Sequence, residues 1–537
     1  MLLRSGSFAV LRGGQRAFAS SADATIARTN QLFIDNVYVP AEGGATLDVL
    51  SPADGAPLTT IAHASAADVD RAVRSARACF DESGWPSTPV EERVGVLKRV
   101  AAALRERQGE LAEIETRDCG KPLGESDADI GFCADMFDYY AETAAASLAP
   151  TKLSIPGGAD AADDFAAHVR HEALGVVGCI TPWNFPLMQS VVKVAPALAA
   201  GCATVLKPSP LASLTSLALG EIVAQAGAPA GALNVVTGGP PELVAGGGST
   251  GQSLIDHPLL DKISFTGSGT AGQLMLASSS PHLRPTSLEL GGKSAVLVFP
   301  DAAEHIDALV DWVMVGIFVC TGQVCSATSR LIVHKDIEPL LTERLLAAAA
   351  KLKVGDPLAE GTQMGPAISR AQLDKIEAAV ARAEAEGATV HRAALDLPAE
   401  LQSGYFTPPT VLTGVGERSS AWTDEIFGPV LSVRTFETEE EAVAAANDTP
   451  YGLANAVFSA DAARCSRVSA ALHSGVVWEN CSQVLFPSTP FGGRAGKKSG
   501  FTAEYGYPGL EEYLSHKTIV SATTPGYGWG WYGGSSA

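Results

Sequence analysis

A strand–helix–strand rhythm between residues 174 and 290 constrains the fold more than any other feature of the sequence. Short β-rich runs at 176–180, 203–206 and 263–265 alternate with helical patterns at 191–200 and 212–226. This alternation is typical of a parallel sheet whose faces are covered by helices. The loops that carry chemistry are then expected at the carboxyl ends of these strands.

A second α/β pattern fills much of the remaining chain. It begins near Ser294 and continues to about Gly475, with a helix expected at 372–386. The 537 residues are enough for two or three domains with substantial cores. With 46% hydrophobic and 18% charged residues, the composition is that of a globular protein. The sequence therefore predicts an α/β protein with more than one domain.

Charge and composition argue against several classes of partner. The formal net charge of −21 disfavours nucleic acid or an anionic membrane surface as the main partner. No run of eighteen apolar residues occurs, so we expect no membrane span. The nine cysteines form no C-x-x-C pair, which indicates reduced thiols and no metal site.

The first 22 residues have the composition of a targeting segment. They contain three arginines and four serines, and the first acidic residue is Asp23. This composition resembles a mitochondrial presequence. The sequence thus predicts a leader over 1–22 and a location in the mitochondrial matrix, with another organelle or a plain disordered tail as alternatives.

Cys325 lies in the segment Gly-Gln-Val-Cys-Ser-Ala-Thr-Ser-Arg at 322–330. A cysteine taken alone is more often structural than catalytic. Three further segments change that interpretation, namely Pro-Trp-Asn-Phe-Pro (182–186), Leu-Glu-Leu-Gly-Gly-Lys (288–293) and Glu-Ile-Phe-Gly-Pro (425–429). In this order, the four segments resemble the aldehyde dehydrogenase superfamily across nearly the whole chain beyond the leader. The resemblance implies NAD(P)-dependent oxidation of an aldehyde to a carboxylic acid.

The resemblance also implies roles for three catalytic residues. Cys325 is the expected nucleophile, because a thiolate can form a covalent tetrahedral species with an aldehyde. The Asn184 amide and the Cys325 main-chain N–H are the expected oxyanion donors. Glu289 is the expected general base, which activates the thiol or the water that hydrolyses the thioester. Relatives that transfer the acyl group to coenzyme A tend to lack this glutamate, so water is the expected acceptor.

A glycine-rich turn at 265–272 follows a predicted strand and opens a helix, an arrangement that can hold a pyrophosphate. The resemblance places Lys207 at the adenine ribose, and Glu425 and Phe427 at the nicotinamide riboside. NAD is the expected cofactor, but Pro210 stands where NAD-preferring relatives usually carry glutamate, so NADP is not excluded. The complete predicted cofactor set is Ile180, Trp183, Lys207, Ser209, Gly251, Gly267, Ser268, Gly272, Leu290, Glu425 and Phe427.

The same resemblance implies a Rossmann-type NAD-binding domain, an α/β catalytic domain and a β-arm for oligomerisation. The NAD-binding domain is expected to comprise 23–150 and 171–288, and the catalytic domain 289–500. The arm and the C-terminal tail are expected at 151–170 and 501–537. The arm would link subunits into a homodimer or homotetramer.

Several stretches are similar to the plant-type betaine aldehyde/aminoaldehyde dehydrogenase branch. The substrate-pocket residues that this implies are Phe185, Phe491, Asp129 and Leu485. Valines at 192 and 319 occupy positions where tryptophans usually stand, which makes the pocket more apolar. A semialdehyde or general aliphatic aldehyde dehydrogenase is therefore the alternative enzyme. A thiol hydrolase and a cofactor-binding scaffold without activity are the alternatives outside this reaction.

Overall fold

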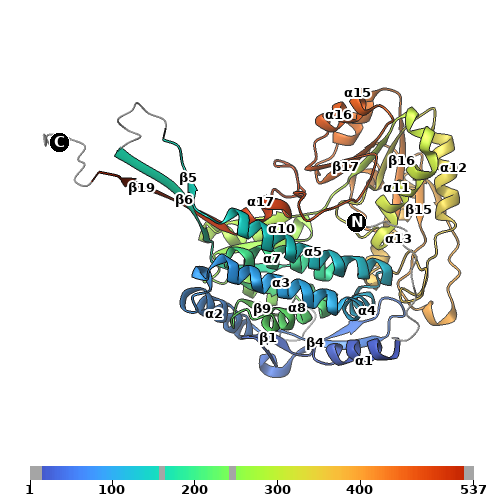
Figure 1. Cartoon of the computed structure of the whole chain (residues 1–537). Helices are drawn as coiled ribbons and strands as arrows, with labels where there is room; N and C mark the ends of the chain where they lie inside the picture. Colours follow the sequence, from blue (N-terminus) through green and yellow to red (C-terminus); the bar gives the residue numbers. More distant parts are fainter. Residues whose placement is uncertain (1–14, 156–163, 241–248, 525–537) are drawn as a thin grey trace.

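The computed structural model describes residues 15–155, 164–240 and 249–524. Two seven-stranded sheets, each covered by helices, lie one beside the other, and a narrow β-ribbon extends away from the first sheet (Figure 1). This confirms the predicted α/β fold, since both sheets are largely parallel. Residues 1–14 of the predicted leader at 1–22, residues 156–163 of the predicted arm at 151–170, and residues 525–537 of the predicted arm and tail at 501–537 lie outside the described residues.

The first sheet has the strand order β11-β10-β7-β8-β9-β1-β2. Its five parallel strands are β7 (Val176–Ile180), β8 (Ala203–Lys207), β9 (Leu233–Val235), β10 (Lys262–Thr266) and β11 (Thr286–Glu289). β1 (Leu32–Ile34) and β2 (Val37–Val39) continue it as antiparallel strands, and β3 (Thr46–Leu50) pairs with β4 (Pro57–Ala62) in a separate hairpin. The three predicted strands thus match β7, β8 and β10.

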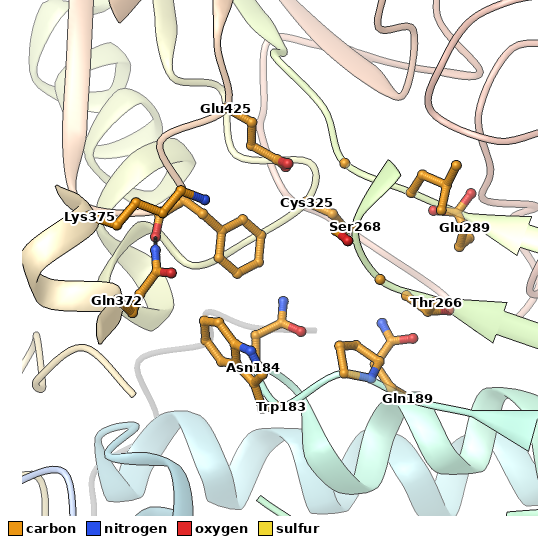
Figure 2. A pocket seen from close by; sticks show the side chains of 15 residues that line it. Trp183, Asn184, Gln189, Thr266, Ser268, Glu289, Cys325, Gln372, Lys375 and Glu425 are labelled. Atoms are coloured by element: carbon orange, nitrogen blue, oxygen red, sulfur yellow. Dashed lines mark hydrogen bonds between the residues drawn. The ribbon is translucent and has the colours of Figure 1, made fainter. Parts of the chain in front are cut away.

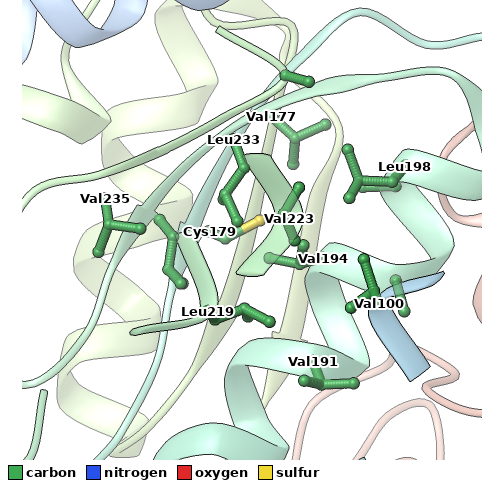
Figure 3. Close-up of a cluster of buried hydrophobic side chains, with 14 of the residues drawn as sticks. Val100, Val177, Cys179, Val191, Val194, Leu198, Leu219, Val223, Leu233 and Val235 are labelled. Atoms are coloured by element: carbon green, nitrogen blue, oxygen red, sulfur yellow. The ribbon is translucent and has the colours of Figure 1, made fainter. Parts of the chain in front are cut away.

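Helices cover both faces of the first sheet. They are α1 (Gln15–Ile26), α2 (Ala66–Glu82), α3 (Val90–Glu106), α4 (Gln108–Cys119), α5 (Leu123–Ser147), α7 (Pro186–Ala200), α8 (Leu214–Gln225), α9 (Thr250–Ile255), α10 (Gly269–Ser279) and α17 (Gly506–Glu511). Side chains of β7 and β9 pack against α7 and α8 in a buried apolar core (Figure 3). Removal of this apolar surface from water is the main favourable contribution to folding.

Helix α7 begins five residues before the predicted start at 191. Pro186 occupies its first position, where a fixed φ and a missing N–H cost nothing. The predicted leader boundary after residue 22 falls inside α1, whose Ala22 and Ile26 pack with Leu47 and Ile61.

The second sheet has the order β14-β15-β16-β13-β12-β17-β18, and only β14 is antiparallel. Its strands are β12 (Ala295–Val298), β13 (Arg330–His334), β14 (Thr389–Arg392), β15 (Thr410–Thr413), β16 (Val430–Phe436), β17 (Ala454–Phe458) and β18 (Val476–Glu479). The helices of this unit are α11 (Ile306–Phe318), α12 (Glu338–Ala349), α13 (Arg370–Ala385), α14 (Ser420–Thr423), α15 (Glu439–Asn447) and α16 (Ala462–Ala471).

The stretch Pro300–Gly322 contains α11 and is long and apolar enough, by composition alone, to qualify as a membrane span. Leu309, Val313 and Ile317 of this stretch pack into the core beside the second sheet. Its packing is therefore that of a core helix.

The ribbon consists of three antiparallel strands, β5 (Thr151–Lys152), β6 (Phe165–Ala173) and β19 (Leu514–Ala522). β6 and β19 pair over nine residues, from Phe165 opposite Ala522 to Ala173 opposite Leu514. Segments far apart in the sequence thus meet in one arm that projects from the body of the molecule (Figure 1).

Candidate active site

A cleft of about 220 Å3 lies where the carboxyl ends of β7, β10 and β11 face loops of the second unit. Parallel strands gather their following loops at this edge, so residues distant in sequence meet there. Figure 2 shows their side chains pointing toward a common space. The lining residues are Pro182, Trp183, Asn184, Gln189, Thr266, Gly267, Ser268, Glu289, Leu290, Gly291, Cys325, Gln372, Lys375, Glu425 and Phe427.

Cys325 is half-buried on one wall of the cleft. The backbone before it is sharply bent, since Cys320, Thr321 and Gly322 all have positive φ values of 51°, 56° and 69°. A Cβ at Gly322 would lie 2.3 Å from the Gly428 carbonyl oxygen, so only glycine is accommodated there. Burial, followed by the charge of Glu289, raises the pKa of the Cys325 thiol well above its usual range. The thiol therefore needs a base before it can act as a nucleophile.

Asn184 is buried at the end of the loop after β7. Its Nδ2 donates a hydrogen bond to the Gln323 carbonyl oxygen at 2.8 Å. The main-chain carbonyl oxygen of Asn184 accepts a hydrogen bond from the Cys320 thiol, with 3.3 Å between Sγ and O. A primary amide carries two hydrogens, so one remains for an oxygen atom bound in the cleft beside Cys325.

Glu289 is the last residue of β11 and is only 2% exposed. Its Oε1 accepts a hydrogen bond from the Gly493 N–H at 3.1 Å, and Oε2 has no partner among the residues that the structure describes. Burial, then the nearby charge of Glu504, raises the pKa of Glu289 well above its usual range, although Lys193 opposes this. An unpartnered buried carboxyl oxygen in the same cleft as a thiol can, once ionised, accept a proton from that thiol or from a water molecule.

The cofactor side of the cleft centres on the amino end of α10. Ser268 caps this helix, because its Oγ accepts a hydrogen bond from the Ala271 N–H at 3.3 Å. The free N–H groups and the helix dipole there suit a pyrophosphate. Trp183 and Phe427 meet edge to face at 5.3 Å across the cleft, and Glu425 accepts a hydrogen bond from the Gly292 N–H at 3.0 Å. These residues can hold a dinucleotide.

The remaining predicted cofactor residues lie beside this cleft. Ile180 and Lys207 are paired across β7 and β8, at the carboxyl edge of the sheet. Lys207 is nearly buried, its Nζ donates a hydrogen bond to the Pro208 carbonyl oxygen at 3.1 Å, and burial lowers its pKa to about 8. Ser209 follows in the same loop, and a Cβ at Gly251 would lie 3.5 Å from the Lys207 Cε. Gly272, on α10, packs so closely on Leu290 that a Cβ would come within 2.7 Å.

The four predicted substrate residues do not line this cleft. Phe491 is buried in the first core, and Phe185, Leu485 and Cys325 pack against the same core. Asp129 is buried in contact with the ammonium group of Lys121. The structure therefore places three of the four in or against the same large core as Cys325, and Asp129 in an ion pair.

Sequence reasoning missed four polar residues of the cleft: Gln189, Thr266, Gln372 and Lys375. Gln372 donates a hydrogen bond through Nε2 to the Phe427 carbonyl oxygen at 2.8 Å. Gln372 and Lys375 stand three residues apart on α13, so they share one helix face. The sequence predicts this helix, but it does not indicate that the face with Gln372 and Lys375 lines the cleft.

Comparisons with known proteins agree with this geometry. A family model described as "Aldehyde dehydrogenase family" matches residues 38–519. The chain is 43% identical to "Aminoaldehyde dehydrogenase 2, peroxisomal" of Pisum sativum over 511 residues, which is 94% of this chain and 98% of that relative. It is 42% identical to "Betaine aldehyde dehydrogenase, chloroplastic" of Beta vulgaris, with the same coverage.

Among solved structures, the chain is similar to betaine aldehyde dehydrogenase from Staphylococcus aureus in complex with NAD+. The TM-score is 0.88 and the identity 35%, over 95% of this chain and 98% of that one.

The predicted mitochondrial location is wrong. The relatives of Pisum sativum and Beta vulgaris are named as peroxisomal and chloroplastic. The inference relied on residues 1–22, where a basic, serine-containing composition is shared by segments of several kinds.

Proposed function

The chain belongs to the aldehyde dehydrogenase family, and we propose that it oxidises an aminoaldehyde or betaine aldehyde to the carboxylic acid with NAD+. It is an NAD-dependent aldehyde dehydrogenase, and an aldehyde is its substrate. The observation that carries the substrate proposal is the likeness to aminoaldehyde and betaine aldehyde dehydrogenases along 94% of the chain. The meeting of Cys325, Glu289 and Asn184 in one cleft supports the chemistry.

The proposed first step is attack by the Cys325 sulfur on the aldehyde carbon. A bond forms between Sγ and that carbon while the thiol proton passes to Glu289, directly or through water. The negative oxygen that results is stabilised by the remaining Asn184 amide hydrogen and the Cys325 main-chain N–H. Such preorganised donors commonly contribute about 3–4 kcal/mol each to lowering a barrier.

When bound, NAD+ supplies the acceptor for the hydride that leaves the aldehyde carbon. We propose that Ser268 and the amino end of α10 hold the pyrophosphate, and that Glu425, Phe427 and Trp183 hold the nicotinamide riboside. Lys207, in the loop after β8, is proposed to contact the adenine ribose.

The acyl group that remains on Cys325 is a thioester. Glu289 first releases the thiol proton to solvent and, with its unpartnered Oε2, is then proposed to take a proton from a water molecule that attacks the thioester carbon. The carbon–sulfur bond breaks, the sulfur takes this proton from Glu289 to restore the thiol, and the carboxylic acid leaves.

We also propose that the domains divide this work. Residues 23–150 and 171–288 would bind NAD, residues 289–500 would carry the nucleophile, and residues 151–170 and 501–537 would form the oligomerisation arm and tail. The projecting ribbon supports a homodimer or homotetramer, because β19 is an edge strand and Val520 on it is 63% exposed.

The test is NADH production with a panel of aldehydes. It should contain betaine aldehyde, 3-aminopropanal, 4-aminobutanal, succinic semialdehyde and hexanal, each with NAD+ and NADP+. The Cys325→Ala variant should lose turnover while it still binds NADH, which fluorescence quenching measures. A higher kcat/KM for hexanal than for betaine aldehyde and the two aminoaldehydes would contradict the substrate proposal and favour a general aliphatic aldehyde dehydrogenase. The buried Val192 supports that alternative, because it is an aliphatic side chain at a position where relatives usually carry a tryptophan.

A further inference from the structure

Lys121 is a buried cation beside Phe185, one of the residues that the family resemblance implies for the substrate pocket. It lies in the short connection between α4 and α5, and its side chain is 1% exposed. Its Nζ contacts Asp129 and lies 3.5 Å from Oε1 of Glu115. A third carboxyl, that of Glu125, lies close enough to interact electrostatically and accepts a hydrogen bond from the Cys320 N–H at 2.9 Å. One ammonium group and three carboxyl groups therefore form a buried cluster of ionisable side chains.

This cluster contacts one aromatic ring, that of Phe185, the residue next to Asn184 of the cleft. The Nζ of Lys121 lies 4.1 Å from the centroid of the Phe185 ring. Phe185 directly follows Asn184, is half-buried and packs against the same core as Cys325. Because Lys121 is almost fully buried, the exposed part of the ring cannot be the face that Lys121 covers. The Lys121 ammonium group thus covers one face of the Phe185 ring from inside the protein, and the rest of the ring stays accessible.

A ring that already binds one cation binds a second more weakly. The first cation draws π-electron density toward itself, and the two positive charges repel each other across the ring. Carboxylates around the first cation oppose this effect, because they reduce the net positive charge behind the ring. A neutral substrate of the same shape is insensitive to both contributions.

We propose that Lys121 and Asp129 determine how strongly this enzyme prefers positively charged over neutral aldehydes, acting through the ring of Phe185. This inference rests on the proposed oxidation of a cationic aldehyde at Cys325. The positive charge of Lys121 weakens the binding of a cationic substrate to the ring, and the negative charge of Asp129 counteracts this effect. Both are specificity-determining residues that do not themselves touch the substrate.

Betaine aldehyde and 3,3-dimethylbutanal form a suitable pair of probes. They have the same shape, because a quaternary nitrogen in one replaces a quaternary carbon in the other, and they differ in charge. The quantity to measure is the ratio of their kcat/KM values with saturating NAD+. Lys121→Met should raise this ratio and Asp129→Asn should lower it, each by roughly threefold or more. A purely structural role would lower both kcat/KM values and leave the ratio unchanged.

Lys262→Met is the matched control. Lys262 is also buried, pairs with Glu512 at 2.8 Å and lies 5.7 Å from the Tyr513 ring. Its loss should leave the ratio unchanged. If Lys121→Met does not fold, Asp129→Asn preserves the side-chain shape and must still lower the ratio.

The outcomes separate the two proposals. A ratio that stays constant in both variants, or that moves in the same direction in both, overturns the inference about Lys121 and Asp129. A wild-type enzyme that oxidises 3,3-dimethylbutanal but neither betaine aldehyde nor 3-aminopropanal and 4-aminobutanal overturns the proposed substrate class instead.

Discussion

Asn184 donates one of its two amide hydrogens to the main-chain carbonyl oxygen of Gln323, with 2.8 Å between nitrogen and oxygen. Gln323 stands two residues before Cys325 and is itself fixed, because its Oε1 accepts a hydrogen bond from the Ile368 N–H at 2.9 Å. The contact joins the first unit to the loop that carries the nucleophile. It thus orients the second amide hydrogen of Asn184 relative to the Cys325 sulfur.

Replacing Asn184 by alanine should lower kcat by about 100- to 1000-fold, because a preorganised donor to the oxyanion is lost. The KM for NAD+ should change little, since the amide acts on the aldehyde oxygen. Steady-state NADH production with betaine aldehyde measures both quantities.

Gln323→Ala is the companion variant for this prediction. Its main-chain carbonyl still accepts the Asn184 hydrogen bond, so its loss of kcat should be clearly smaller. Equal losses in the two variants would mean that the loop geometry, and not the Asn184 amide, controls the rate.

The pH dependence of stability should change in Asp118→Asn. Asp118 is fully buried, its Oδ2 accepts a hydrogen bond from the Leu214 N–H at 2.9 Å, and burial raises its pKa to about 8. Between about pH 4 and pH 8 the folded chain keeps a proton here that the unfolded chain releases. This stabilising contribution is therefore complete below about pH 4 and is lost as the pH rises toward 8.

Asparagine cannot take part in this proton exchange. The free energy of unfolding of Asp118→Asn should therefore fall less steeply with pH than that of the wild type, as measured by urea denaturation at pH 6, 7 and 8. Parallel curves for the two proteins would contradict the raised pKa. Asp54→Asn is a suitable control, because this aspartate lies in a turn and is only partly buried.

The sequence predicts those parts of the molecule that depend on local patterns. The strands near 176, 203 and 263 follow from short β-rich runs, and Asn184 and Glu289 lie close together because β7 and β11 are parallel strands that end at one edge of the first sheet. Cys325 reaches them from the loop before β13 of the second unit, and only the family resemblance predicts that meeting. Contacts between the first and the second unit cannot be predicted from the local sequence pattern of either one.

Lys375 is one such case, since it reaches the cleft from α13 of the second unit. Lys121 is another: its position under the ring of Phe185 results from how α4, α5 and α7 pack together. The family resemblance implies a place for Asp129 in the substrate pocket, but sequence alone does not show its pairing with Lys121.

Pro210→Glu should strengthen the preference for NAD+ over NADP+. Pro210 lies in the loop after β8, three residues beyond Lys207, the proposed contact to the adenine ribose. A carboxylate there would repel a 2′-phosphate, so the ratio of kcat/KM values should rise by about tenfold, equivalent to about 1.4 kcal/mol. Pro210→Gln is the uncharged control. Equal ratios in the two variants would exclude charge repulsion as the cause.

The acidic limb of the pH–rate profile should move in Glu504→Gln. The negative charge of Glu504 is the second cause, after burial, of the raised pKa of Glu289, and Lys193 acts in the opposite direction. Lys193 pairs with Glu504 at 2.6 Å between Nζ and Oε1. The substitution removes one negative charge and leaves the positive charge of Lys193 uncompensated. Both changes favour the carboxylate form of Glu289, so its pKa should fall.

Only the carboxylate form of Glu289 can accept a proton, so a lower pKa keeps the base active at lower pH. The acidic limb of kcat in Glu504→Gln should therefore move to lower pH, as measured from about pH 5.5 to 9 with saturating betaine aldehyde and NAD+. Glu512→Gln removes the carboxylate that pairs with Lys262 and should leave the limb in place. A limb that moves to higher pH in Glu504→Gln would show that Glu504 supports the carboxylate form of Glu289, against the electrostatic argument.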